Sequence, residues 1–183
     1  MAVSKIAFIG SHGIRKTTAA HGLIAAARAR GLTPGFVPEV VRDCPLPVNE
    51  GLTPEAALWA FTTQIGRELE VGAKADLVVC DRSVVDEAAY YLRATGGADP
   101  CHAMGLVAGW AATYTLFVRL LPDVGLVADG FRSVNDKFRD DVEAVLDRLV
   151  PQLVSADRLV TLHASDINET FDFGSFLARV GRG

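Results

Sequence analysis

The residues with the clearest potential for chemistry lie at positions 10–18, which read Gly-Ser-His-Gly-Ile-Arg-Lys-Thr-Thr. They follow a short apolar run at 6–9, which predicts a buried strand, and precede an alanine-rich segment that predicts a helix. A strand that ends in a glycine-rich turn and continues as a helix directs successive backbone N–H groups and the positive end of the helix dipole at one point. The chemistry that this arrangement suits is phosphate binding.

The spacing matches the Walker A pattern of Gly, four residues, Gly-Lys and Ser/Thr at every position except one. Gly10, Lys16 and Thr17 are in register, whereas Arg15 occupies the place of the second glycine. An arginine there is expected to strain or reshape the loop, because the backbone conformation of the second glycine costs a residue with a Cβ about 1 kcal/mol or more. Its guanidinium, however, is itself a strong hydrogen-bond donor to phosphate. The alternative is an ordinary strand, turn and helix with an incidental lysine; the Thr17-Thr18 pair favours a nucleotide loop.

The nucleotide-binding residues are therefore expected to be Gly10, Ser11, His12, Gly13, Ile14, Arg15, Lys16, Thr17 and Thr18. In such a loop Lys16 bridges the terminal phosphates of ATP and the hydroxyl of Thr17 holds Mg²⁺. Asp81 ends the apolar stretch 75–81, so it is expected to face the loop as a second magnesium ligand or to orient an acceptor hydroxyl. The alternative for Asp81 is a cap on the following helix or a carboxylate in a turn.

Two further charged residues are expected at the same edge of the sheet. Glu39 lies at the end of an extended, proline-containing segment, where it could take a proton from an attacking hydroxyl or bind a sugar hydroxyl; a solvated glutamate is the alternative. Arg82 is a candidate for binding an anionic substrate; the alternative is that it forms a salt bridge at the surface. Trp59, Phe61, Tyr90 and Tyr91 are candidates for the pocket wall or for the core.

A polar segment rich in arginine and aspartate follows Pro122 and predicts a lid at about 122–141. Arg132 and Arg139 could project from this lid onto the transferring phosphate, as an arginine finger in cis does, and both are predicted to be catalytic. The alternative is a solvated, basic start of a helix.

The order of the elements predicts an α/β fold with a five-stranded parallel sheet covered by helices on both faces. Strands are expected at 5–10, 33–43, 75–81, 114–121 and 157–163, with 5–10 central and the proline-containing segment near an edge. Helices are expected at 16–30, 53–74, 84–94, 104–111, 142–149 and 167–180. We expect a single domain spanning residues 1–183.

Composition narrows the class of protein. The 183 residues are 50% hydrophobic and 22% charged, with a formal net charge of −4, which is typical of a globular domain and disfavours a nucleic-acid partner. The three cysteines show no metal-ligand spacing. Without a signal peptide or a stretch of about 20 apolar residues, we expect a cytoplasmic protein that does not associate with membranes. A homodimer is compatible with the sequence.

Four segments together resemble the small P-loop kinase-like ATPases related to nicotinamide riboside kinase and, more distantly, the deoxynucleoside kinases. These segments are 10–18, 37–42 (Val-Pro-Glu-Val-Val-Arg), 80–86 (Cys-Asp-Arg-Ser-Val-Val-Asp) and 130–139, which begins Gly-Phe-Arg-Ser. The resemblance implies a three-layer P-loop NTPase fold with ATP and Mg²⁺ as cofactors and Arg42 as a further substrate-binding residue. In this family Asp81-Arg82-Ser83 matches the acid-Arg-Ser motif, and Arg132 and Arg139 match the lid arginines.

The predicted function is ATP-dependent phosphoryl transfer to a hydroxyl of a nucleoside, a nucleotide or a related small molecule, which makes the protein a kinase. A nucleotide-binding regulatory module, or a degenerate ATPase impaired by Arg15, is the first alternative. A kinase that acts on modified bases in DNA is the second, and the acidic net charge disfavours it.

Overall fold

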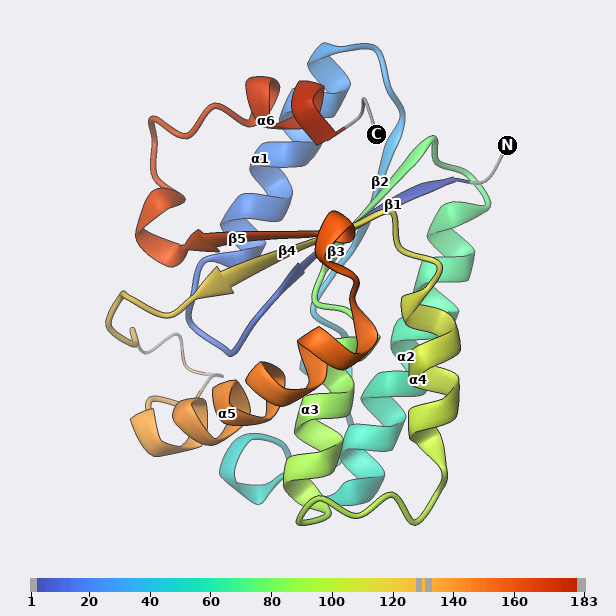
Figure 1. The fold of residues 1–183 in the computed structure, drawn as a ribbon, viewed down its shortest axis with the longest axis vertical. Coiled ribbons are helices and arrows are strands. Elements are labelled where there is room, and N and C mark those ends of the chain that lie inside the picture. The colour runs from blue at the N-terminus through green and yellow to red at the C-terminus, as the bar shows by residue number, and fades with distance from the viewer. Residues whose placement is uncertain (1–2, 128–129, 131–132, 181–183) are drawn as a thin grey trace.

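The structure is a computed structural model and describes residues 3–127, 130 and 133–180. Its centre is a five-stranded parallel sheet in the order β2-β3-β1-β4-β5, which confirms the predicted sheet with the first strand in the middle (Figure 1). The proline-containing strand is at one edge, as expected, but it spans only 34–37 rather than 33–43, because 40–43 form a 3-10 turn. The strands are β1 Ser4–Ile9, β2 Pro34–Val37, β3 Leu77–Asp81, β4 Leu116–Leu121 and β5 Leu159–His163.

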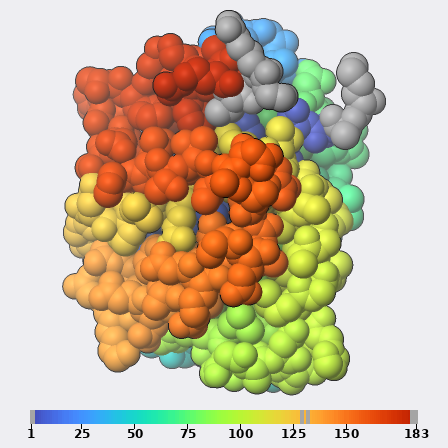
Figure 2. Space-filling view, in the orientation of Figure 1, coloured from blue at the N-terminus to red at the C-terminus, as the bar shows by residue number. Residues whose placement is uncertain are grey.

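Helices cover both faces of the sheet and give three layers (Figure 1). On one face lie α1 Lys16–Ala29 and α6 Phe173–Val180, and on the other lie α2 Pro54–Gly72, α3 Val84–Ala94, α4 Ala103–Ala111 and α5 Asp136–Leu153. In the view of Figure 2, α5 (orange) and the C-terminal segments (red) form much of the surface, with α4 (yellow-green) beside them. No helix in the described part of the chain combines the length and apolar character that crossing a bilayer would require.

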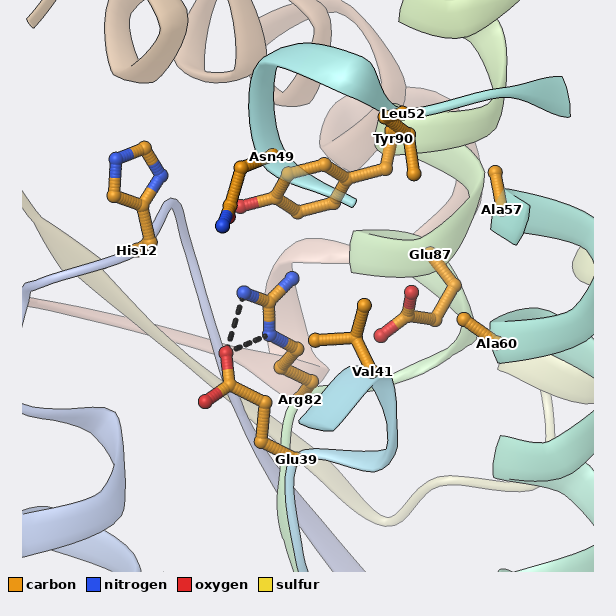
Figure 3. A pocket seen from close by; sticks show the side chains of 10 residues that line it. All are labelled: His12, Glu39, Val41, Asn49, Leu52, Ala57, Ala60, Arg82, Glu87 and Tyr90. Carbon is orange, nitrogen blue, oxygen red and sulfur yellow. Dashed lines mark hydrogen bonds and ion pairs between the residues drawn. The ribbon is translucent and has the colours of Figure 1, made fainter. Parts of the chain in front are cut away.

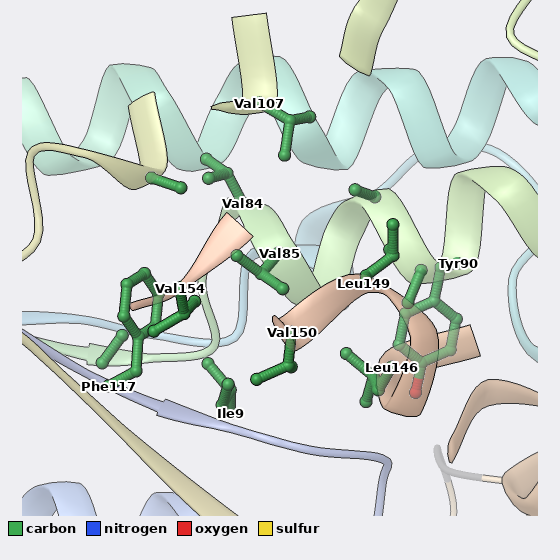
Figure 4. Packing of buried hydrophobic residues seen from close by; sticks show 14 of the residues in the cluster. Ile9, Val84, Val85, Tyr90, Val107, Phe117, Leu146, Leu149, Val150 and Val154 are labelled. Carbon is green, nitrogen blue, oxygen red and sulfur yellow. The ribbon is translucent and has the colours of Figure 1, made fainter. Parts of the chain in front are cut away.

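The two cores follow from the alternation of side chains along buried strands. On β1, Ile6 and Phe8 belong to the core with α1 and α6, whereas Ala7 and Ile9 belong to the core with α3, α4 and α5. Figure 4 shows Ile9 within the second of these cores. Because both faces are covered, residues 6–9 of β1 are all apolar. Burying one large aliphatic side chain contributes about 1.5–3 kcal/mol, so these layers hold the strand ends rigidly in register.

Register brings the predicted site residues to one edge of the sheet. Phe8 of β1 pairs with Asp81 of β3, and Val37 of β2 pairs with Cys80. The backbone N–H of Arg82 donates to the carbonyl of Phe8 at 3.1 Å and so extends the ladder by one residue. The carboxyl ends of β1, β2 and β3 therefore lie side by side, which is where open α/β sheets bind ligands.

Two helices begin several residues away from the starts that the sequence predicts. Helix α5 begins at Asp136 rather than near 142, because the side chain of Asn135 accepts a hydrogen bond from Phe138 N at 3.2 Å and caps the helix. Helix α6 begins at Phe173 rather than at 167, because 164–166 form a separate 3-10 turn. The predicted lid at 122–141 therefore includes the first residues of α5.

Candidate functional site

The glycine-rich loop leaves β1 in a conformation that only glycine tolerates at its first position. Gly10 has φ 135°, and a Cβ there would lie 2.4 Å from Cδ1 of Ile14 and 2.6 Å from the carbonyl oxygen of Leu120. Gly13 also has positive φ, 77°, and a Cβ there would lie 2.6 Å from Cδ2 of Leu126. Gly10 thus requires glycine both for its backbone conformation and for its lack of a side chain, whereas Gly13 favours glycine for its backbone conformation.

Two buried carboxylates hold the base of this loop. Asp86 accepts a hydrogen bond from Gly10 N at 2.8 Å, and Glu143 accepts one from Ser11 N at 2.7 Å. The second oxygen of Asp86 accepts from Ser83 N at 2.8 Å, so one side chain caps the start of α3 and anchors the loop. Burial raises the pKa of Asp86, and the nearby Lys16 opposes that rise.

Lys16 lies folded against its own loop. Its Nζ donates to the carbonyl of Gly10 at 2.9 Å and to the carbonyl of Ser11, and the residue is 5% exposed. Burial lowers the pKa of Lys16, and the positive charge of Arg82 lowers it further. The ammonium group thus rests on two carbonyl oxygens at the place where phosphate oxygens are expected.

Arg15 adopts the left-handed conformation that glycine would otherwise supply, with φ 63° and ψ 21°. This conformation costs a residue with a Cβ about 1–2 kcal/mol. Its guanidinium donates to the carbonyl of Ile167 at 2.8 Å, and the side chain as a whole is exposed. The arginine side chain thus leaves the loop towards the turn before α6, where its guanidinium binds the carbonyl of Ile167.

Thr17 and Asp81 meet between β1 and β3. Oγ1 of Thr17 donates to Oδ2 of Asp81 at 2.5 Å. Oδ1 of Asp81 is buried and has no hydrogen-bond partner among the described residues. The cap on α3 is Ser83, so Asp81 is not the helix cap that the sequence also allowed.

Glu39 and two arginines form an ion cluster at the ends of β2 and β3. Arg82 donates to Oε1 of Glu39 twice, from Nε at 2.9 Å and from a terminal nitrogen at 2.6 Å, while Nε of Arg42 donates to Oε2 at 2.9 Å. The Arg82 and Glu39 side chains are 4% and 3% exposed. The three predicted substrate-binding residues therefore lie together, and the surface alternatives for Glu39 and Arg82 do not apply.

A narrow pocket opens beside this cluster (Figure 3). The guanidinium of Arg82 lies over the ring of Tyr90, with 4.6 Å from its Cζ to the ring centroid. Small residues of α2 close the opposite side. The lining residues are His12, Glu39, Val41, Asn49, Leu52, Ala57, Ala60, Arg82, Glu87 and Tyr90.

Glu87 contributes a carboxyl group to this pocket that the sequence did not single out. The residue is 1% exposed, and its Oε1 has no hydrogen-bond partner among the residues that the structure describes. Burial raises the pKa of Glu87 to about 7, against the attraction of Arg82. Burial likewise raises the pKa of the neighbouring Tyr90 to about 12.

A second polar network holds the backbone of Arg82, which has φ 94°. Nε2 of Gln64 donates to the Arg82 carbonyl at 3.2 Å and to Glu68 at 2.9 Å. Glu68 also accepts from Lys5 at 2.6 Å, from Trp110 at 2.8 Å and from the hydroxyl of Tyr114, all within the layer that contains α2. These contacts stabilise a backbone conformation that is uncommon for residues other than glycine.

Of the two arginines predicted in the lid, the structure describes one. Arg139 donates to the carbonyl of Val124 at 3.2 Å and pairs with Asp136 at 3.0 Å, so its charge is held within the lid segment. Arg132 lies outside the described residues. The hydroxyl of Ser133 donates to Glu50 and joins the start of α5 to the loop over the pocket.

The remaining predicted residues divide between loop and core. Ser11, His12 and Ile14 are buried in the loop, the His12 ring lying 5.4 Å from that of Phe138, whereas Thr18 is exposed on α1. Among the predicted aromatic candidates, Tyr90 alone lines the pocket; Phe61 belongs to the larger core, and Tyr91 to a small cluster beside α4. Trp59 is half-buried on α2.

A comparison with known families decides the relationship. Residues 5–155, from β1 to the end of α5, match a family described as an AAA domain. The chain belongs to the AAA-domain family. The matched range contains the whole loop, the ion cluster and the pocket of this AAA-domain protein.

Two of the individual relatives of this AAA-domain protein are thymidylate kinases. It is 29% identical over 170 residues to a thymidylate kinase of Psychrobacter sp. (strain PRwf-1), across 79% of this chain and 78% of that one. A solved NadR protein in complex with NR superposes with a TM-score of 0.71 at 15% identity; 99% of this chain matches, but only 51% of the NadR chain. The thymidylate kinase from Ehrlichia chaffeensis gives 0.65 at 16% identity, covering 98% and 99% of the two chains. These structures show a P-loop kinase fold.

Three acidic residues at the site of this AAA-domain protein are not predicted from the sequence to belong to the site. Asp86 has a local signal, since Ser83 three residues earlier completes a capping box, although nothing local shows that it also binds the loop. Glu143 accepts a hydrogen bond from Ser11, which is 132 residues away in the chain. Glu87 is recognised as a site residue only because the structure shows that it lies on the side of α3 that lines the pocket. Such long-range contacts depend on packing rather than on spacing.

Proposed function

We propose that this protein transfers the γ-phosphoryl group of ATP to a hydroxyl of a nucleoside, a nucleotide or a related small molecule. The observation that carries the proposal is the contact of Thr17 with Asp81 at 2.5 Å, between the loop that bears Lys16 and the pocket that bears Glu39 and Arg82. A phosphate site and an acceptor pocket on either side of one carboxylate are what phosphoryl transfer requires. Two relatives that are named thymidylate kinases support the same class of reaction.

The loop is proposed to bind the phosphates of ATP. Lys16 would exchange the carbonyls of Gly10 and Ser11 for phosphate oxygens, which are stronger partners for an ammonium group. The backbone N–H groups that follow Gly13 and the N-terminus of α1 would add partial positive charge. Arg139 would join them only by leaving Val124 and Asp136, which makes it a proposed lid residue that acts on closure.

Thr17 and Asp81 are proposed to hold Mg²⁺. Their hydroxyl and carboxylate oxygens are the donor type that Mg²⁺ prefers. Oδ1 of Asp81 has no hydrogen-bond partner within 3–127, 130 and 133–180, which leaves a lone pair for the ion or for its water. The described residues contain no cluster of three or more acidic, His or Cys ligands, which agrees with an ion held mainly by phosphates and water. When bound, Mg²⁺ neutralises charge on the transferring phosphate.

Glu39 and Arg82 are proposed to act on the acceptor. The acceptor oxygen forms a bond to the γ-phosphorus, the bond from that phosphorus to the bridging oxygen breaks, and ADP leaves with the bonding electrons. Glu39 takes the proton of the hydroxyl, and Arg82 fixes the carboxylate by two hydrogen bonds while it lies on Tyr90. Burial of this pair keeps their orientation fixed as the acceptor binds.

The test is release of ADP from Mg·ATP with and without a panel of nucleosides and nucleoside monophosphates. The acceptor should stimulate release by the wild type, and Lys16→Ala should reduce the stimulated rate at least about 100-fold. Lys74→Ala is the matched control, because Lys74 is exposed at the end of α2, before β3. A rate that no acceptor changes, or that survives Lys16→Ala, would rule out the proposal.

Arg15 favours a second candidate function, a nucleotide-binding module with little turnover. Its left-handed backbone is strained, and its guanidinium is engaged by Ile167 on the far side of the loop from the pocket. Titration of Mg·ATP into the wild type and into Arg15→Gly separates the two cases. Similar affinities favour the kinase, whereas tighter binding by the variant together with acceptor-independent behaviour of the wild type favours the module.

A further inference from the structure

The pocket beside the ion cluster contains one acidic group that the proposed reaction does not use. Glu87 is 1% exposed, and it faces the same space as Val41, Ala57 and Ala60 (Figure 3). Its Oε1 has no hydrogen-bond partner in the described part of the chain. A buried polar atom without a partner is destabilising, so an acid kept in a ligand pocket points to a partner supplied by the ligand.

The surroundings of Glu87 favour the neutral acid. The neighbouring charges are Arg82 from the end of β3, Asp86 from α3, Glu39 from the segment after β2 and Lys16 from the loop. His12 and Tyr90 also line the pocket, while α2 presents only the methyl groups of Ala57 and Ala60. Arg82 is the cation that acts most strongly on Glu87, but its two side-chain hydrogen bonds to Glu39 hold its guanidinium on that carboxylate. Glu39 and Asp86 are like charges, which disfavour a further anion.

A neutral carboxylic acid pairs with a specific arrangement of hydrogen-bonding groups on a ligand. Its O–H donates one hydrogen bond and its carbonyl oxygen accepts another, side by side in one plane. The matching ligand edge carries an adjacent acceptor and donor, as the Watson–Crick edge of a nucleobase or a ring carboxamide does. A sugar or a simple alcohol has no such planar edge, and the apolar walls of Val41 and Leu52 suit the faces of a flat ring.

This inference rests on the proposed function. We propose that the acceptor is a neutral molecule that carries a heterocycle, such as a nucleoside, and that its planar donor–acceptor edge pairs with the carboxyl group of Glu87. Glu87 is then the specificity-determining residue of the pocket, while Glu39 and Arg82 act on the reacting hydroxyl. The narrow cavity must widen to admit a ring, and the loop that carries Asn49 and Leu52 is the wall nearest to the lid contact between Glu50 and Ser133.

The experiment titrates the four ribonucleosides adenosine, cytidine, guanosine and uridine into the Mg·ATP-analogue complex between pH 6 and pH 8.5. Affinity of the wild type for the tightest of them should fall about 30-fold over this range, because only the protonated acid donates and its pKa is about 7. Glu87→Gln presents a permanent donor and acceptor, so it should bind the same nucleoside with little change across the range. Glu70→Gln, at a side chain that is 66% exposed, is the control and should follow the wild type.

Two results would overturn the inference: no binding of any of the four nucleosides by the wild type, or the same pH dependence in Glu87→Gln as in the wild type. Removing the donor from the ligand gives a second readout, since purine riboside should bind at least 10-fold more weakly than adenosine if adenosine binds. The assay of ADP release reports separately on the proposed function. Nucleoside binding with the expected pH trend but without transfer would overturn that function and leave the pairing intact.

Discussion

The hydroxyl of Thr17 lies 2.5 Å from the carboxylate of Asp81, although the two residues are 64 positions apart in the chain. The contact exists because β1 and β3 are parallel neighbours whose carboxyl ends coincide, with Phe8 paired to Asp81. The glycine-rich loop and the acidic end of β3 thus form one site, in which Asp81 lies between the loop and the Glu39–Arg82 pair.

Replacing Asp81 by Asn tests this contact. The amide keeps the shape of the side chain but removes the charge that favours Mg²⁺, so we expect phosphoryl transfer to fall about 100-fold and the magnesium concentration for half-maximal rate to rise. Steady-state rates across a magnesium series measure both effects. An unchanged magnesium dependence would show that Asp81 does not contribute to ion binding.

Arg15 gives a prediction about stability. Arg15→Gly relieves the left-handed strain but loses the hydrogen bond to Ile167 and adds flexibility to the unfolded chain, so its free energy of unfolding should stay within about 1 kcal/mol of the wild type. Arg15→Ala keeps the strain and loses the bond, and should be about 1 kcal/mol less stable than the glycine variant. Urea unfolding measures both; equal stabilities of the two variants would contradict this account of the backbone.

Asp86 is expected to be the residue through which α3 stabilises the loop. Asp86→Ala leaves Gly10 N without its buried acceptor and removes the cap partner of Ser83, which should cost about 2–4 kcal/mol of unfolding free energy. The matched control is Asp76→Ala, whose hydrogen bond to Thr33 N is exposed and should matter by less than about 1 kcal/mol. Thermal and urea unfolding give the comparison. Equal losses in the two variants would show that the loop anchor is not important for stability.

Glu87 makes the stability depend on pH in a definite direction. Its pKa is raised in the folded protein from 4.5 to about 7, so the folded state holds a proton that the unfolded state releases, and stability falls as pH rises through this window. The gap corresponds to about 3 kcal/mol. Glu87→Gln removes this dependence, so the variant should gain up to that amount relative to the wild type between pH 4.5 and pH 8. Parallel unfolding curves at every pH would contradict the prediction.

Much of the fold and part of the site are predictable from local patterns. The strand ends, the loop from Gly10 to Thr18 and Asp81 follow from apolar runs and motif spacing, and the same reasoning predicts that Glu39 and Arg82 lie at one edge. The start of α5 is missed because Asn135 caps a polar first turn that has little hydrophobic periodicity.

Other features depend on tertiary packing and have no local signal. The direction of the Arg15 side chain is set by the carbonyl of Ile167, 152 residues away, so the sequence could not show that its guanidinium is engaged there. Glu87 and Glu143 are ordinary helical glutamates by pattern, and become site residues only because α3 and α5 pack over the loop and pocket.

The central claim is tested most directly by following the γ-phosphate of labelled ATP into an acceptor. Wild-type protein with Mg·ATP and a pool of nucleosides and nucleoside monophosphates should yield a labelled acceptor that is identified by mass spectrometry. The same reaction with Lys16→Ala should yield at most about 1% of it. Binding of ATP without any labelled acceptor above the level of the Lys16→Ala reaction would contradict the account and leave a nucleotide-binding module.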